Sequence, residues 1–362
     1  MKPQGTNRKR VGIMKITIRK LAELAGVSRG TVDKVVHGRP GVSDPVREKV
    51  LALLEEYQYA PRHKAPEPAN PEAQKVIAVL MPRLTNPFFA NLRRGMEDTC
   101  AQMQNRRVRM EYFDCDEANI PEMLNILSYL EERGVDGIAM RGVQSSRIRD
   151  KLNAFAAARV PVLLFDSDVI GAERLCIVGE DSRRTGRLAA SLLAKSIGGA
   201  GEVAIVGGSP DVAVHRFRIQ GFQELVREKY PQMRIIEVVN SFDQSVITYE
   251  KTVKMIERHP DLRGIFSVVG CPGDIGQALI DCKATRIKMV SYNFTPDVVA
   301  LIKRGIIEFT IGLSPYRQGE LAVQLLADYV LFGKKPAAPF VETPVYIGVD
   351  ENIDLLSRNG MV

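Results

Sequence analysis

Residues 17–38 read Thr-Ile-Arg-Lys-Leu-Ala-Glu-Leu-Ala-Gly-Val-Ser-Arg-Gly-Thr-Val-Asp-Lys-Val-Val-His-Gly and predict two short helices joined by a tight turn. Thr17 is a good N-cap for the first helix. Gly26 tolerates the positive φ that stops this helix. We expect its apolar face to consist of Leu21, Ala22, Leu24 and Ala25.

The second helix begins after Ser28, which can cap it, and ends at Gly38. Its inward face follows the spacing of an amphipathic helix and consists of Val32, Val35 and Val36. A third helix is predicted over residues 43–57, with Pro45 in its first turn. Two helices joined by a glycine-containing turn of this length are typical of the DNA-reading helix-turn-helix unit.

The positive charge of the chain is concentrated at the same end. Residues 1–64 hold 14 Lys and Arg against 6 Asp and Glu, whereas the remaining 298 residues hold 36 against 37. A basic module on a near-neutral body is suited to a polyphosphate partner. The charge pattern therefore favours double-stranded DNA as a partner.

Composition excludes several other classes of protein. No apolar run approaches the roughly 18 residues of a membrane span, and the basic first ten residues lack the apolar segment of a signal peptide. The five cysteines are odd in number and far apart, and the four histidines are scattered. We therefore expect a cytoplasmic protein without membrane contact, disulfide framework, metal site or cofactor.

Beyond residue 75, short apolar strands alternate with amphipathic helices. Such alternation predicts an α/β fold of parallel sheets covered by helices on both faces, with ligands bound beyond the carboxyl ends of the strands. The strand candidates are Val76–Met81, Arg107–Phe113, Gly137–Met140, Pro161–Phe165, Leu175–Val178, Glu202–Val206, Arg234–Val239, Gly264–Val269, Lys288–Ser291, Glu308–Gly312 and Val341–Tyr346.

These patterns divide the chain into four parts. A basic tail precedes an all-α helix-turn-helix head, and a linker with four prolines precedes a two-lobed body. The expected bounds are 1–14 for the tail, 15–62 for the head, 63–74 for the linker and 75–362 for the body, whose first lobe is 75–180 with 314–340 and whose second lobe is 181–313 with 341–362.

Several motifs resemble those of the LacI family of bacterial regulators, whose body resembles periplasmic sugar-binding proteins. In the head the resemblance lies in residues 28–38 and in Tyr59-Ala-Pro61. In the body it is carried by Asn86-Pro-Phe-Phe89, residues 160–166, Asp181-x4-Gly186, Arg218-Ile-Gln-Gly-Phe222 and Tyr292-Asn-Phe-Thr-Pro296. The resemblance implies a ligand-responsive transcriptional regulator.

The same resemblance implies a set of DNA contacts. Arg29 and Lys34 would face the major groove, where each can donate to guanine; the alternative is that both contact phosphate or solvent. Asp33 departs from the small hydroxyl residue that is usual there. The full set is Thr17, Arg19, Ser28, Arg29, Thr31, Lys34 and His37.

The linker departs from the family pattern. Pro66 and Pro68 occupy the stretch where the family forms a hinge helix, and Pro68 stands where a leucine would enter the minor groove. Proline inside a helix costs about 3 kcal/mol. We therefore expect weaker DNA bending than is usual in the family.

The resemblance also implies a ligand site in the body. Asn86 would bond ligand hydroxyls, Phe88 and Phe89 would stack on a ring or belong to the core, and Asp166 would accept from two hydroxyls. The full set is Asn86, Phe88, Phe89, Arg141, Asp166, Arg218, Cys271, Tyr292, Asn293 and Leu313. Asn293 replaces the usual aspartate, and Cys271 and Leu313 replace residues with amide side chains.

These replacements bear on the charge of the ligand. Arg141 and Arg218 would both face the cleft, and Asp166 can neutralise one of them but not easily both. The sequence thus favours an acidic or phosphorylated sugar over a neutral one. The alternative is a neutral sugar, with Arg141 on the surface or paired to Asp136 or Asp166.

We expect a transcriptional repressor that reads a palindromic operator as a homodimer, because one helix-turn-helix buries too little surface for tight binding. A non-catalytic sugar-binding protein without operator specificity is the alternative function. An enzyme is not expected. The glycine cluster at residues 198–201 precedes a strand, whereas a dinucleotide loop follows one.

Overall fold

The computed structural model describes residues 18–36, 41–56, 74–83, 86–103, 108–116 and 119–358. It divides into two compact units, residues 1–66 and 67–362. The expected tail and the linker prolines Pro66 and Pro68 lie outside the described residues.

The first unit contains three helices, α1 (Ile18–Ala25), α2 (Arg29–Val36) and α3 (Asp44–Glu56). Gly26 has a φ of +69° and separates α1 from α2, as expected. Ser28 caps α2, because its hydroxyl accepts from the Thr31 N–H at 3.1 Å. The buried core consists of Leu21, Ala22, Ala25, Val32, Val35 and Val50. The prediction that Leu24 faces inward is wrong, since its side chain is 40% exposed.

The second unit contains two six-stranded sheets. The first has the order β11-β5-β4-β3-β1-β2, and all its strand pairs are parallel. Its strands are β1 (Lys75–Pro82), β2 (Val108–Cys115), β3 (Gly137–Arg141), β4 (Val162–Phe165), β5 (Cys176–Gly179) and β11 (Phe340–Glu342). Its helices are α4 (Pro87–Gln102), α5 (Ile120–Arg133), α6 (Ser146–Ala157) and α12 (Pro315–Phe332).

The second sheet has the order β12-β10-β9-β8-β6-β7, and only its β10–β12 pair is antiparallel among the described strands. Its strands are β6 (Gly201–Gly207), β7 (Met233–Asn240), β8 (Leu262–Val268), β9 (Lys288–Tyr292), β10 (Ile307–Gly312) and β12 (Tyr346–Gly348). Its helices are α7 (Ser182–Ile197), α8 (Ala213–Lys229), α9 (Ser245–Arg258), α10 (Pro272–Asp281), α11 (Pro296–Lys303) and α13 (Ile353–Arg358).

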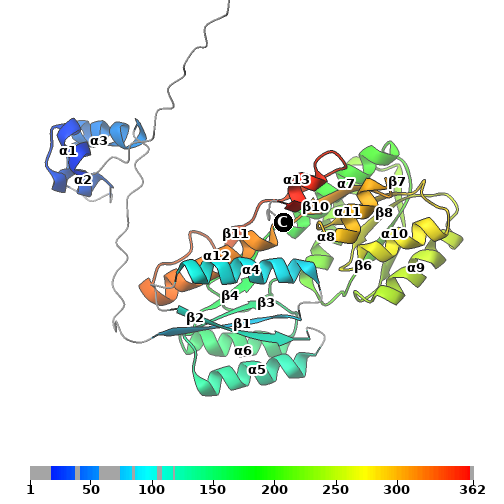
Figure 1. Ribbon diagram of the computed structural model, residues 1–362, viewed down its shortest axis with the longest axis horizontal. Helices are drawn as coiled ribbons and strands as arrows, with labels where there is room; N and C mark the ends of the chain where they lie inside the picture. The colour runs from blue at the N-terminus through cyan, green and yellow to red at the C-terminus, as the bar shows by residue number, and fades with distance from the viewer. Residues whose placement is uncertain are drawn as a thin grey trace, which may run out of the picture. The chain divides into compact units, whose positions relative to one another are not determined.

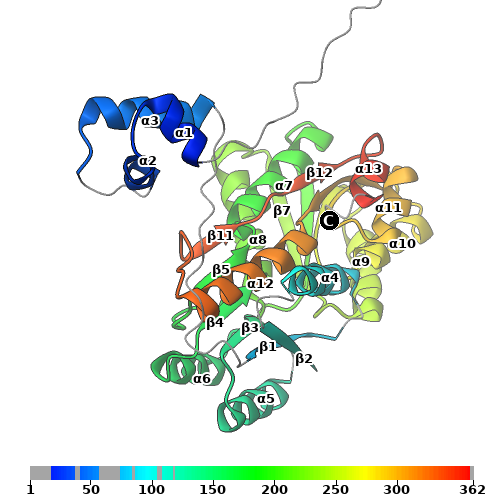
Figure 2. The same cartoon turned by 60° about the vertical axis from the view of Figure 1, so that its left-hand side comes forward.

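Helices cover both faces of each sheet (Figures 1 and 2). Alternate residues of β1 point to opposite faces, so that Ile77 and Val79 join one core with α4, whereas Ala78 and Leu80 join another with α5 and α6. The second sheet is sandwiched in the same way between α7 with α8 and α9 to α11. This is the expected α/β architecture.

Close helix crossings repeat in both lobes. A Cβ on Gly186 of α7 would lie 2.0 Å from the Arg218 carbonyl oxygen of α8, and one on Gly221 would lie 1.9 Å from the Arg183 oxygen. Gly95 and Gly319 allow the same approach of α4 and α12. Glycine is required at these positions because the two backbones touch.

The last predicted strand, Val341–Tyr346, is wrong as a single element. Its residues split between β11, which extends the first sheet, and β12, which joins the second. Pro344 lies between them and cannot donate to a strand ladder. The boundary between the lobes therefore falls at residues 343–345, after Glu342, and not at 340.

Within the described residues, no helix is long and apolar enough to cross a membrane. The same residues contain no group of three or more His, Cys, Asp or Glu side chains that could hold a metal ion.

Candidate effector cleft and DNA-binding head

A cleft of about 790 Å³ opens where the carboxyl ends of both sheets meet. Its volume is within the range of small-molecule sites. The ten residues expected at a ligand site come together here: Asn86, Phe88, Phe89, Arg141, Asp166, Arg218, Cys271, Tyr292, Asn293 and Leu313 all line it.

One wall is formed by the first turn of α4. The Asn86 Oδ1 caps this helix by accepting from the Phe88 N–H at 2.9 Å, and Pro87 follows it. The rings of Phe88 and Phe89 meet edge to face, with their centroids 5.1 Å apart. Both rings are buried in the core, as one interpretation of the sequence expects, and both also border the cleft, where stacking on a ligand ring stays a prediction.

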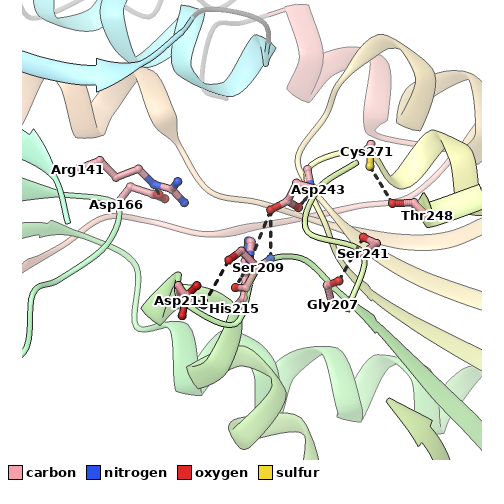
Figure 3. A network of polar contacts seen from close by, with 11 residues as sticks. Arg141, Asp166, Gly207, Ser209, Asp211, His215, Ser241, Asp243, Thr248 and Cys271 are labelled. Atoms are coloured by element: carbon pink, nitrogen blue, oxygen red, sulfur yellow. Dashed lines mark hydrogen bonds and ion pairs between the residues drawn. The ribbon is translucent and has the colours of Figure 1, made fainter. Parts of the chain in front are cut away.

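Arg141 and Asp166 form a buried ion pair beside this wall (Figure 3). The Arg141 Nε donates to the Asp166 Oδ2 at 2.5 Å, and its guanidinium carbon lies 5.0 Å from the centroid of the Phe89 ring. Asp166 follows β4 directly and has a φ of 60°. One alternative from the sequence, that Arg141 pairs with Asp166, is what the structure has.

Arg218 has its own carboxylate, which the sequence analysis missed. Its guanidinium donates to Glu180, and its carbon lies 4.2 Å over the Tyr292 ring. Glu180 and Arg218 are 3% and 6% exposed, so the pair is buried. Burial raises the pKa of Glu180, while the Arg218 guanidinium opposes that rise. Since arginine stays protonated, the pair is neutral only when Glu180 is ionised.

The premise of the acidic-ligand prediction is therefore wrong. That prediction left one arginine without a carboxylate because Asp166 cannot easily neutralise both, but Asp166 pairs with Arg141 and Glu180 pairs with Arg218. The residues that line the cleft include three arginines and four aspartates, so its walls carry no surplus of positive charge.

The opposite wall contains polar residues that the sequence analysis also missed. Asp243 accepts from the Gly270 N–H at 2.7 Å and from the Ser209 N–H at 3.3 Å, and so connects three loops (Figure 3). His215 Nδ1 lies 3.1 Å from the Ser209 carbonyl oxygen. Burial lowers the pKa of His215 to about 4, so its ring is neutral at pH 7. The places of His215 and Asp243 in the sequence could have revealed them. His215 is three residues before Arg218, which puts both on one face of a helix, and Asp243 follows the carboxyl end of a predicted strand.

The remaining residues make this end of the cleft less polar. Leu313 is buried, and Cys271 Sγ lies 3.2 Å from the Thr248 hydroxyl. Burial raises the pKa of Cys271 to about 12, so it is a thiol and not a thiolate. Asn293 has a φ of 66°, and its Oδ1 is buried without a hydrogen-bond partner in the described part of the chain.

The head presents part of the expected DNA-binding set. Arg29 and Lys34 of α2 are exposed, and the hydroxyls of Ser28 and Thr31 lie 2.9 Å apart. Thr17, His37 and the side chain of Arg19 lie outside the described residues, as does the side chain of Asp33.

Residues 17–62 match the family of bacterial regulatory proteins called the lacI family, and residues 77–335 match the periplasmic binding protein domain. The chain thus consists of a helix-turn-helix DNA-binding head of the lacI family and a body that belongs to the periplasmic binding protein domain family.

Relatives come from both classes of protein. The ribose import binding protein RbsB of Bacillus subtilis is 24% identical over 278 residues, which are 76% of this chain and 88% of that protein. The ribose operon repressor of Halalkalibacterium halodurans is 28% identical over 252 residues, 69% of this chain and 71% of that protein. The crystal structure of GanP, a glucose-galactose binding protein from Geobacillus stearothermophilus, matches with a TM-score of 0.72 at 24% identity, covering 77% of this chain and 99% of that one.

Proposed function

We propose that this regulator is a sugar-responsive repressor without catalytic activity, which acts on operator DNA in the cytoplasm. The observation that carries the proposal is the presence of a LacI-type head and an effector cleft in one chain. Relatives named as a ribose operon repressor and a ribose import binding protein support a sugar as the effector.

The chemistry of the cleft supports a neutral sugar. Phe88, Phe89 and Tyr292 offer aromatic surface to the apolar faces of a ring. Arg141 and Asp166 supply a donor and an acceptor side by side, as adjacent hydroxyls require. Because both buried arginines already have carboxylates, a charged ligand would have no counter-ion to meet.

We also propose that the protein binds a palindromic operator as a homodimer. A single small head makes few contacts, and two-fold symmetry places two heads on paired half-sites. Sedimentation of the full chain at micromolar concentration is expected to give twice the mass of one chain. A single-chain mass with and without operator DNA would contradict the dimer.

Titration calorimetry on the full chain tests the effector. We expect D-ribose, D-galactose or D-glucose to bind, and Asp166→Asn to weaken that binding at least about tenfold because it removes an acceptor and the charge that neutralises Arg141.

Asp136→Asn is the matched control. Asp136 is also ion-paired, to Lys75 at 2.8 Å, but it precedes β3 and lies at the opposite end of the sheet. We expect this variant to bind as the wild type does. Equal losses in both variants would mean that Asp166 supports the fold and not the ligand.

A further inference from the structure

Glu180 lies at the point where the chain crosses from one lobe to the other. It directly follows β5 of the first sheet and precedes Asp181, which caps α7 of the second lobe. Its side chain accepts from Arg218 and from the Ser182 hydroxyl, the latter at 3.1 Å. Its other oxygen, Oε2, has no hydrogen-bond partner among the described residues.

Arg218 is held between this carboxylate and the cleft. The Tyr292 ring lies on one side at 4.2 Å, and the backbone of α8 at Arg218 touches α7 at Gly186. The side chain lines the cleft, whereas Glu180 does not. An effector would therefore meet Arg218 but not the charge that neutralises it.

The chain also crosses between the lobes after β10, and a different residue stands there at the position equivalent to Glu180. Gly312 ends β10 as Gly179 ends β5, and the next residue is Leu313 in one case and Glu180 in the other. Leu313 lines the cleft and brings no charge. Glu180 thus sets the net charge around Arg218 without itself lining the cleft.

We propose that Glu180 is a specificity-determining residue of the effector cleft, which makes it reject anionic ligands such as uronates and sugar phosphates by neutralising Arg218. The inference rests on the proposed role of the cleft as an effector site. It deepens that role by naming the residue that excludes one class of sugar derivative.

The variant Glu180→Gln isolates the charge from the shape. Glutamine has the same length, and its carbonyl oxygen can still accept from Arg218. The buried guanidinium would then lack a counter-charge, and an anion entering the cleft would supply one. We expect the variant to bind anions that the wild type rejects.

The experiment is titration calorimetry of the full chain with two probes, D-glucuronate and inorganic phosphate. We expect the wild type to bind neither probe measurably. We expect Glu180→Gln to bind at least one of them, with a dissociation constant about tenfold or more below the weakest binding that could be detected for the wild type. The double variant Glu180→Gln with Arg218→Gln is expected to lose this gain, because the cation has been removed.

Two controls separate this effect from a general change in charge. Glu180→Asp keeps the carboxylate and is expected to reject both anions. Glu342→Gln breaks the exposed ion pair between Arg184 and Glu342, which also connects the two lobes, and should gain no anion binding.

Thermal unfolding provides a second measurement if Glu180→Gln is only marginally folded. Its midpoint should rise with D-glucuronate or phosphate more than that of the wild type does. Equal responses of the variant and the wild type in both measurements would overturn the proposal. Because no operator DNA or neutral sugar is used, failure here is distinct from failure of the proposed function.

Discussion

At the scale of single residues, the two lobes place equivalent side chains in the same strained backbone conformation. Asp166 follows β4 and Asn293 follows β9, and both have φ near +60°. Non-glycine residues are uncommon in this region, although Asp and Asn tolerate it best. Such strain is concentrated at functional sites, which is consistent with both residues facing the cleft.

Arg29 and Lys34 give the first prediction at this scale. We expect Arg29→Ala and Lys34→Ala each to relax the choice of base in sites selected from a random DNA library, since a bidentate contact with guanine is worth about 1–3 kcal/mol of discrimination. Lys49→Ala removes one exposed charge from α3 instead and should weaken all sequences alike. If Arg29→Ala and Lys34→Ala behaved as Lys49→Ala does, both residues would be phosphate contacts.

His215 gives the second prediction at the scale of single residues. Its pKa is lowered by burial to about 4, against 6.5 for an ordinary histidine, so the unfolded chain binds a proton between these values that the folded chain does not. His215 therefore contributes stability above about pH 6.5 that is lost as the pH falls toward 4.

Chemical denaturation across this range measures that effect. We expect the free energy of unfolding to fall less steeply in His215→Gln than in the wild type, by up to about 1.4 kcal/mol per pH unit. Parallel curves for the two proteins would show that His215 does not carry the predicted shift.

At the scale of elements, local pattern was enough for most of the fold. Ten predicted strands appear within a few residues of their expected ends, because buried parallel strands are continuous apolar runs. The region of Val341–Tyr346 was not predictable in this way, since residues in one run pair with different sheets. Glu180 was missed for a related reason, because only the crossing of α7 and α8 brings it to Arg218.

The crossing of α7 and α8 yields a prediction of its own. Gly186→Ala and Gly221→Ala each place a methyl group about 2 Å from a backbone oxygen, so the helices must separate. We expect each variant to lower the stability of the body by about 1–3 kcal/mol in denaturant titrations and to weaken effector binding by moving Arg218.

Gly30→Ala is the control for the glycine substitutions. It adds the same methyl group to a helix, but its nearest neighbour would be 3.7 Å away, and alanine favours the helix. We expect unchanged or slightly higher stability. Normal stability of Gly186→Ala would mean that the helices pack less closely than the structure shows.

At the scale of the whole molecule, the chain joins two units that we expect to bind different partners. The head carries exposed basic residues on α2, and the body carries a cleft between two lobes that share three crossover segments. A ligand that bound two arrangements of the lobes unequally would shift the balance between them. Regulation would then consist of coupling between that balance and the affinity for DNA.

The most direct test of this account is the fluorescence anisotropy of a DNA site, selected from a random library, with the full chain and the neutral sugar that calorimetry identifies. We expect the sugar to change the dissociation constant for DNA by about 5-fold to 150-fold, and Asp166→Asn to bind the DNA but lose that response. Sugar binding with no change in DNA affinity would contradict the central claim.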